Sequence, residues 1–352
     1  MTTGNPKPSP HRAPVVIATV VLAVAATACS GTTSRPSASG ATPSAAHANT
    51  TRSTPTRATG PSAGCRAAPV APGTTDARIR SGGRERSYLL DVPEGYDGRQ
   101  PYALVFGLHS LSIDYHVVPA SAGFPELHRR HRFIGVAPSG LVSDVPFWNA
   151  AAVADNYDVV FLTRLLDHLE RMLCVDTARV FSLGMSNGAQ MSSLLACRLP
   201  GRIAAIGAIA GVEFPRPCAG EPVPVIAFHG RRDPFVPYAG GGLNAVAIAD
   251  QHHYHGDLPP GTPTPTGVDA SMASWARHNR CDPEPAETRI SAEVVRRVWE
   301  RCAAPTELYV VDDGGHAWPG RPQPALEKVL GHTTTDIDAT RLVGAFFFED
   351  RP

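Results

Sequence analysis

The sequence predicts an α/β fold with a mostly parallel central sheet that helices cover on both faces. From Cys65 onward, apolar runs of strand length alternate with longer segments of helical periodicity. Such alternation indicates parallel strands, because parallel neighbours need a crossover connection that a helix usually supplies. The nearly continuous apolar run Tyr102–Leu108 is typical of a strand buried on both faces of a sheet. Three polar motifs also follow predicted strands, and in open α/β sheets functional groups gather at strand carboxyl ends.

The individual elements follow from these patterns. Strands are expected at Tyr88–Val92, Tyr102–Leu108, Phe133–Ala137, Ala178–Leu183, Ile203–Ala210, Val223–Phe228 and Leu308–Val311. Between Asp155 and Leu173 the apolar residues recur with helical spacing, which predicts a helix with one face on the core. A second helix is expected over Ala189–Ala196 and a final one over Asp336–Phe348, with Asp338 and Asp350 on either side of its apolar face.

Composition divides the chain into three parts. Residues 1–28 combine Lys7, His11 and Arg12 with an uncharged apolar run that is too short to span a bilayer, as in a signal peptide. Residues 29–64 are almost entirely Ser, Thr, Ala, Pro and Gly, which cannot bury enough apolar surface to fold, so we expect a flexible tether. Residues 65–352 are predicted to form one catalytic domain.

The end of the apolar run indicates export. Ala26-Thr27-Ala28 precede Cys29, which resembles the cleavage site of a bacterial lipoprotein, where the cysteine becomes the lipidated N-terminus. We therefore expect an anchored protein at the outer face of the cell membrane. Ordinary secretion after Ala28 is the alternative.

Seven cysteines support the same interpretation. Disulfides are typical of exported proteins, and lipidation of Cys29 leaves an even number. Six cysteines permit 15 pairings. The spacing favours Cys197–Cys218 and Cys281–Cys302, which leaves Cys65–Cys174.

Charge and composition exclude several partners. The formal net charge is zero and no basic stripe occurs, so a nucleic-acid partner is not expected. No dinucleotide- or phosphate-binding loop is present, and no cofactor is expected. His252, His253 and His255 are clustered, but no accompanying zinc motif occurs, so we expect no metal site. The Pro- and Gly-rich segment 239–267 around them is interpreted as a solvated insertion beside the substrate cleft.

The three polar motifs supply a nucleophile, an acid and a base in that order. They are Gly184-Met185-Ser186-Asn187-Gly188, His229-Gly230-Arg231-Arg232-Asp233 and Gly314-Gly315-His316-Ala317-Trp318-Pro319-Gly320. This order is that of serine hydrolases built on the α/β-hydrolase sheet, whereas other serine hydrolase folds use different orders. The strand–turn–helix context of Ser186 is the one that its motif requires, since the glycines allow a sharp turn.

Each residue has an expected role. Ser186 is the predicted nucleophile, His316 the general base and Asp233 the acid that orients His316. Asp312 and Asp313 are closer in sequence to His316 and are interpreted as turn residues. The backbone N–H of Asn187, at a helix N-terminus, is expected to stabilise an oxyanion. A second N–H is expected from Leu111 or from Ser110, in the loop where His109 is interpreted as a structural residue.

These motifs resemble the secreted polyhydroxybutyrate depolymerase and feruloyl esterase family, which includes lipoprotein esterases of the LpqC type. Val236-Pro237-Tyr238 after the second motif are part of the resemblance, and the third motif is its most specific part, because Trp318 and Pro319 are not required by hydrolase chemistry in general. The resemblance covers residues 65–352 and implies an α/β-hydrolase fold, the Ser186–Asp233–His316 triad and no metal. It also implies cleavage of feruloyl or acetyl esters of polysaccharides, or of short hydroxyalkanoate esters.

The chain departs from the family at two places. His109-Ser110 stands where many relatives have His-Gly, and Asp155-Asn156-Tyr157-Asp158 replaces a common acidic pair. The second departure leaves the substrate open. His109, Trp148, Tyr238 and Trp318 are candidates for lining the cleft.

The leading hypothesis is an exported serine esterase that acts on an ester substrate, which could be polymeric. An envelope acyltransferase with the same triad and a non-catalytic surface-binding lipoprotein are the alternatives. The sequence does not name the substrate or the oligomeric state.

Overall fold

The computed structural model describes residues 60–142, 145–218, 220–241 and 266–349. Residues 53–352 form one compact unit, to which all of these belong; the other unit, residues 1–52, lies outside the described part. The predicted signal peptide, Cys29, most of the tether, Asp350 and the histidines at 252–255 are likewise outside the described residues. Within the described ranges, no helix has the length and apolar character needed to cross a membrane.

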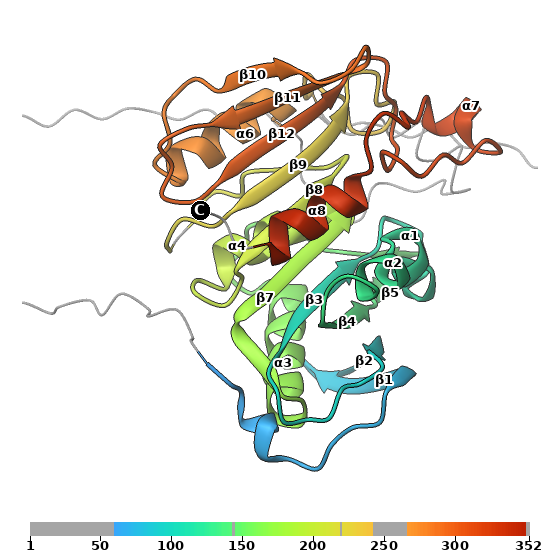
Figure 1. Ribbon diagram of the computed structural model, residues 1–352, viewed down its shortest axis with the longest axis vertical. Coiled ribbons are helices and arrows are strands. Elements are labelled where there is room, and N and C mark those ends of the chain that lie inside the picture. Colours follow the sequence, from blue (N-terminus) through green and yellow to red (C-terminus); the bar gives the residue numbers. More distant parts are fainter. Residues whose placement is uncertain (1–59, 143–144, 219, 242–265, 350–352) are drawn as a thin grey trace, which may run out of the picture. The chain divides into compact units, whose positions relative to one another are not determined.

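A ten-stranded sheet forms the centre of the fold (Figure 1). Its spatial order is β1-β2-β4-β3-β7-β8-β9-β12-β11-β10. The strands are β1 (Gly73–Ser81), β2 (Arg84–Val92), β3 (Tyr102–Leu108), β4 (Phe133–Pro138), β7 (Val175–Met185), β8 (Ala205–Ile209), β9 (Val225–Gly230), β10 (Ala286–Arg289), β11 (Val294–Trp299) and β12 (Thr306–Val311). A separate two-stranded sheet joins β5 (Leu141–Val142) to β6 (Pro146–Phe147).

The central strands β4, β3, β7, β8, β9 and β12 pair in parallel, and antiparallel strands flank them at both edges. This confirms the predicted α/β fold with a mostly parallel sheet. Strands β1, β10 and β11 were not predicted. The edge strands β1 and β10 are largely exposed and polar, so they lack the apolar run that identifies a buried strand.

Helices cover both faces of the sheet. The helical segments are η1 (Ala63–Arg66), η2 (Tyr115–Val117), α1 (Val118–Ser121), α2 (Phe124–His128), α3 (Tyr157–Met172), α4 (Asn187–Arg198), α6 (Val268–His278), α7 (Glu327–Leu330) and α8 (Ala339–Phe348). Successive side chains of β3 point to opposite faces of the sheet, as in any strand, so they belong to two separate cores. Leu104 and Phe106 pack with α3, α4 and α6, whereas Ala103 and Val105 pack with α2 and α8.

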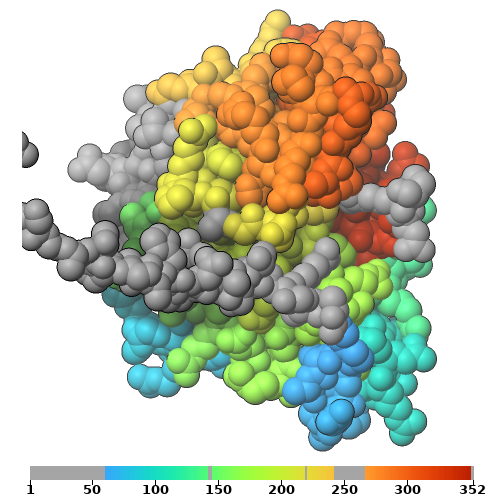
Figure 2. All heavy atoms as spheres, turned by 90° about the vertical axis from the view of Figure 1, so that its left-hand side faces the viewer, coloured from blue at the N-terminus to red at the C-terminus, as the bar shows by residue number. Residues whose placement is uncertain are grey.

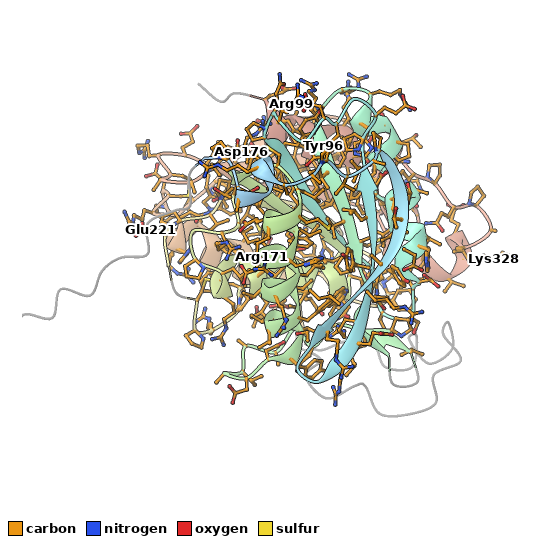
Figure 3. The ribbon with its side chains drawn as sticks, turned by 90° about the horizontal axis from the view of Figure 1, so that it is seen from below. Tyr96, Arg99, Arg171, Asp176, Glu221 and Lys328 are labelled. Atoms are coloured by element: carbon orange, nitrogen blue, oxygen red, sulfur yellow. A yellow bond between two sulfur atoms is a disulfide. The ribbon has the colours of Figure 1, made fainter. Side chains whose placement is uncertain are left out.

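Three disulfides join distant parts of the chain, and all three predicted pairings are confirmed: Cys65–Cys174, Cys197–Cys218 and Cys281–Cys302. The Cys65–Cys174 disulfide lies at the end of the domain that contains its first described residues, drawn blue in Figure 2. The orange β10, β11 and α6 lie at the opposite end. Tyr96, labelled in Figure 3, adds to this end by accepting a hydrogen bond from the Cys174 N–H at 2.7 Å.

The folded region begins before Cys65, so the predicted tether is too long. Ser62 is buried, its N–H donates to Val175 O at 2.8 Å, and its hydroxyl donates to Leu173 O at 2.6 Å. Gly64 packs so closely on Leu173 that a β-carbon there would lie 2.2 Å from the Leu173 oxygen. Composition missed these contacts because backbone groups and small side chains make them.

Helix α3 begins at a polar cap and carries a buried ion pair. The Asn156 side chain accepts hydrogen bonds from the Asp158 and Val159 N–H groups, which is a standard N-cap. Arg86 of β2 donates to Asp158 at 2.6 Å, and these side chains are 4% and 0% exposed. Asp158 also accepts from the Asn149 N–H at 2.8 Å, so the pair fixes the segment that follows β6.

We predict that Asp158→Asn lowers the free energy of unfolding by about 3–5 kcal/mol, because it leaves the Arg86 charge buried without a partner. The matched control is Glu85→Gln, which breaks the Arg78–Glu85 pair, where the side chains are 68% and 57% exposed. Exposed pairs contribute less than about 1 kcal/mol. Urea unfolding of both variants tests this; equal losses would contradict the assigned role of burial.

Candidate active site

Ser186 lies at a sharp, strained turn between β7 and α4. Its φ of 56° and ψ of −122° are unusual for a residue with a side chain. A β-carbon on Gly184 would lie 2.4 Å from the Gly188 backbone, and one on Gly188 would lie 2.2 Å from the Leu108 oxygen. A β-carbon on Gly211 would lie 2.4 Å from the Ser186 oxygen. The turn therefore depends on these three glycines, the last of which the motif does not include.

His316 and Asp233 meet because they follow adjacent strands. Parallel pairing of β9 and β12 brings their carboxyl ends together, and the Arg232 N–H donates to Gly314 O at 2.9 Å. Asp233 Oδ2 lies 2.8 Å from His316 Nδ1, and both side chains are buried. The pair has the arrangement of a base and the acid that orients it.

The other oxygen of Asp233 is also occupied. Oδ1 accepts the N–H groups of Phe235 and Val236, both at 2.8 Å. His229 Nε2 lies 3.4 Å from Oδ2 and 2.9 Å from the Val236 oxygen, to which it donates. Burial alone would raise the pKa of Asp233, but the charges and hydrogen bonds of His316 and His229 outweigh it and hold the pKa well below its ordinary value. Asp233 is therefore ionised at neutral pH and can stabilise a protonated His316.

Asn187 supports the turn with its side chain and leaves its N–H free. The side-chain oxygen accepts from the Trp148 N–H at 2.8 Å, and the side-chain nitrogen donates to Trp148 O at 3.0 Å. The Asn187 N–H opens helix α4 and has no acceptor among the described residues. Its position fits an oxyanion donor next to Ser186.

The loop after β3 lies on the other side of the turn. The Ser110 hydroxyl donates to the Met185 oxygen at 3.1 Å, which ties this loop to the residue before Ser186. The Ser112 N–H donates to Pro146 O, whereas the N–H groups of Ser110 and Leu111 have no acceptor among the described residues. Either could supply the second oxyanion contact. Ser110, which replaces the family's glycine, therefore contributes an additional hydrogen bond.

His109 is a buried, neutral support of this loop. Its Nε2 accepts from the Gly140 N–H at 2.8 Å, and its Nδ1 lies 2.7 Å from Ser110 O, to which it donates. These partners define one tautomer, since an N–H can only donate and a carbonyl can only accept. Burial lowers the pKa of His109 to about 4. The ring is uncharged at neutral pH, as a structural role requires.

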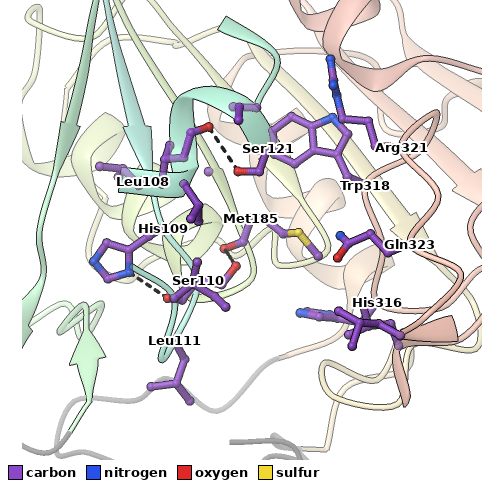
Figure 4. Close-up of a pocket in the computed structure, with 18 of the residues that line it drawn as sticks. Leu108, His109, Ser110, Leu111, Ser121, Met185, His316, Trp318, Arg321 and Gln323 are labelled. Atoms are coloured by element: carbon purple, nitrogen blue, oxygen red, sulfur yellow. Dashed lines mark hydrogen bonds between the residues drawn. The ribbon is translucent and has the colours of Figure 1, made fainter. Parts of the chain in front are cut away.

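A pocket of about 530 Å³ opens beside His316 (Figure 4). His109, Ser110 and Leu111 lie on one side of it, and His316, Trp318, Arg321 and Gln323 lie on the other. Met185, immediately before Ser186, also lines it. Most of the remaining lining is aliphatic and comes from residues 113–122 and 322–330.

Of the four predicted cleft residues, His109 and Trp318 line this pocket, whereas Trp148 and Tyr238 do not. Trp148 is fully buried behind Asn187, where its ring N–H donates to His109 O at 3.1 Å. Tyr238 is 9% exposed, and its hydroxyl donates to Asp269 at 2.5 Å on the side of α6. Both aromatic rings serve packing, which sequence position alone does not reveal.

Sequence reasoning assigned no role to His229 or to residues 113–122. His229 was within the quoted second motif, and its spacing of four residues from Asp233 was a usable signal. Residues 113–122 show no periodic pattern, and their role in the pocket depends on tertiary contacts. The described residues contain no group of three or more side chains suited to hold a metal ion. Asp312 and Asp313 pair with Arg231 and Arg232 in the turn after β12.

We predict that His109→Gln reduces the loss of stability on acidification. The folded pKa of about 4 lies below the ordinary 6.5, so the stabilisation is fully present above about pH 6.5 and is lost as the pH falls towards 4. Between pH 7 and pH 4.5 this single group lowers the free energy of unfolding by about 2 kcal/mol. The variant should not show this loss.

His116→Gln is the control for this measurement. Hydrogen bonds with Asp114 and Asp76 raise the pKa of the exposed His116, so its contribution is present at low pH and is lost as the pH rises. Urea unfolding at both pH values should shift the two variants in opposite directions. A His109 variant with the wild-type pH dependence would overturn the neutral assignment.

Comparison with known proteins places the chain among esterases. It is 30% identical to feruloyl esterase C of Emericella nidulans over 266 residues, which cover 72% of this chain and 83% of that protein. It is 31% identical to feruloyl esterase D of Neurospora crassa over 190 residues, 50% of this chain and 63% of that protein. No protein-family model matches the chain.

Among solved structures, an acetyl xylan esterase from Aspergillus awamori has the same fold, with a TM-score of 0.52 and 13% identity over 69% of this chain and 94% of that one. The extent of the match to feruloyl esterase C confirms the family that the motifs indicated. The chain belongs to the feruloyl esterase family, has an α/β-hydrolase-type fold and is a carboxylic-ester hydrolase.

Proposed function

We propose that this chain is an exported serine esterase in which Ser186, His316 and Asp233 form the catalytic triad. The observation that carries the proposal is the strained turn at Ser186, together with the His316–Asp233 pair at the ends of adjacent strands. Ser186 Oγ makes no hydrogen bond with another described residue, so it is available to a substrate. Glycines at a strand–helix turn and a buried, ionised acid behind a histidine are the features that activate a serine.

The residues divide the reaction into two steps. Ser186 Oγ attacks the ester carbonyl while His316 Nε2 takes its proton, and Asp233 stabilises the charged imidazole. The N–H of Asn187 and that of Leu111 or Ser110 stabilise the negative oxygen. His316 then gives its proton to the leaving alcohol, which leaves the acyl group on Ser186. Water, activated by His316, releases the acid and restores the serine.

The substrates to test first are feruloyl and acetyl esters of polysaccharides and short hydroxyalkanoate esters. The names of the relatives support the first of these classes, and the sequence motifs support all three. The described pocket lies beside the proposed triad and is large enough for acyl groups of several sizes.

We predict that Ser186→Ala abolishes hydrolysis of p-nitrophenyl acetate, methyl ferulate and a soluble hydroxybutyrate oligomer, leaving only about 10³–10⁴-fold acceleration over water. Asp233→Asn should lower kcat by about 10⁴, because the histidine loses its correct tautomer. Asp312→Asn is the matched control, since Asp312 also follows a strand but pairs with Arg231 and Arg289. Full activity of the Ser186 variant would contradict the proposal. If product forms only when an acceptor alcohol is added, the result would favour an acyltransferase. If the wild type turns over none of these esters, the result would favour a binding protein.

The proposal includes an N-terminal lipid anchor on Cys29. The three disulfides support an oxidising, exported location. We predict that Cys29→Ala moves the protein from the membrane fraction to the medium without changing its activity, which fractionation and an esterase assay would measure. Equal distribution of the variant and the wild type would contradict anchoring and favour ordinary secretion.

A further inference from the structure

The pocket beside the proposed triad has apolar walls from three distant segments. The loop after β3 contributes Leu108 and Leu111, the η2–α1 segment contributes Val117 and Val118, and the segment after His316 contributes Leu326 and Leu330. Leu111 and His316 connect these walls to the proposed oxyanion loop and base. Ser186 itself is not among the residues that line this pocket, but Gly184 and Met185, which precede it, are. A group bound here therefore lies next to the proposed nucleophile.

The polar side chains that line the pocket are already paired. Ser110 donates to Met185 O, and Ser121 donates to Val118 O at 3.2 Å. Both ring nitrogens of His109 are hydrogen-bonded. Arg321 donates to Thr340 and to Glu126, both at 3.0 Å.

The ring N–H of Trp318 also donates to Thr340, at 3.0 Å. Gln323, which is exposed at the rim, the reacting nitrogen of His316 and Nη1 of Arg321 have no polar partner among the described residues. The lining of the pocket is therefore mostly apolar, with a few free hydrogen-bonding groups on the side of His316 and Arg321.

This lining discriminates between acyl groups. An aliphatic chain loses no hydrogen bond and gains burial with each methylene. The acyl group is also the half of the ester that stays on the serine while the alcohol leaves, so it gains most from an enclosed site.

The outer end of the pocket remains apolar where it meets solvent. Val117 is 48% exposed and Leu326 is 40% exposed, although both are large hydrophobic residues that line the pocket. Exposed apolar side chains at the mouth of a binding site are suited to an apolar ligand that extends through it. A chain longer than an acetyl group would contact both.

We propose that this pocket binds the acyl half of the substrate and selects an unbranched aliphatic chain of medium length over an acetyl group. The proposal rests on the proposed serine esterase function. Leu326 and Val117 are then specificity-determining residues, because they contact the part of the chain that an acetyl group lacks.

The test is kcat/KM of the full chain for p-nitrophenyl acetate, butanoate, hexanoate and octanoate. Complete burial gives about a fourfold gain for each methylene, so we expect a rise of about two- to fourfold per methylene up to octanoate. A series of acetate esters with longer alcohols should show no comparable rise.

Two variants of the same segment localise the effect. Leu326→Gln should lower the octanoate-to-acetate ratio of kcat/KM by about five- to tenfold, since it replaces apolar contact with a polar group. Val329→Gln is the matched control, because Val329 is 43% exposed but does not line the pocket, and it should retain the wild-type ratio.

The outcomes separate this proposal from the proposed function. A flat or falling chain-length series, or a rise confined to the alcohol series, would overturn the acyl-chain assignment. Each of these results would leave the esterase function intact, provided that hydrolysis is lost in Ser186→Ala. Equal ratios in the Leu326 and Val329 variants would also overturn it. Failure of the wild type to cleave any ester would instead overturn the proposed function.

Discussion

The backbone turn at Ser186 is the constraint on which the rest of the site depends. A residue with a side chain adopts its φ of 56° only where the surroundings hold it there. The Ser186 N–H donates to Ile209 O at 2.8 Å, and the turn packs on Gly188 and Gly211 without room for a β-carbon. Contacts with β8 and the residues that follow it thus hold the strained turn. Ser186 is half-buried there, and the Asn187 N–H, which has no acceptor among the described residues, follows it at the start of α4.

His109 and Asp233 are both buried, but His109 is neutral and Asp233 is ionised. His109 is surrounded by one donor and one acceptor and has no counterion, so burial keeps it neutral and its ring holds the oxyanion loop. Asp233 is equally buried, but two N–H groups and two imidazoles keep it ionised. Burial therefore keeps His109 neutral, whereas the partners of Asp233 hold it ionised against the effect of burial. Only the local partners distinguish the two outcomes.

Catalysis and substrate selection come from different parts of the fold. The proposed triad lies at the carboxyl ends of β7, β9 and β12, where the sheet fixes the positions of its residues. The pocket walls come from the segments after β3 and after His316, which connect these strands to helices. Connecting segments can change without disturbing the sheet. In this proposal the chemistry of the acyl pocket can therefore change while the proposed triad stays in place.

Much of this molecule could be predicted from local sequence. Tyr102–Leu108 is apolar throughout and forms β3 with those bounds, and the glycines around Ser186 identify its turn, because both signals depend on neighbouring residues. Trp148 and Tyr238 could not be placed, since an aromatic side chain in a cleft and one in a core have the same sequence signature. The edge strands β1 and β10, the contact of Ser62 with Val175 and the joining of Val117 with Leu326 in one pocket were also decided only by tertiary structure. The physical reason is that these features arise from contacts between segments far apart in the chain, which no local pattern encodes.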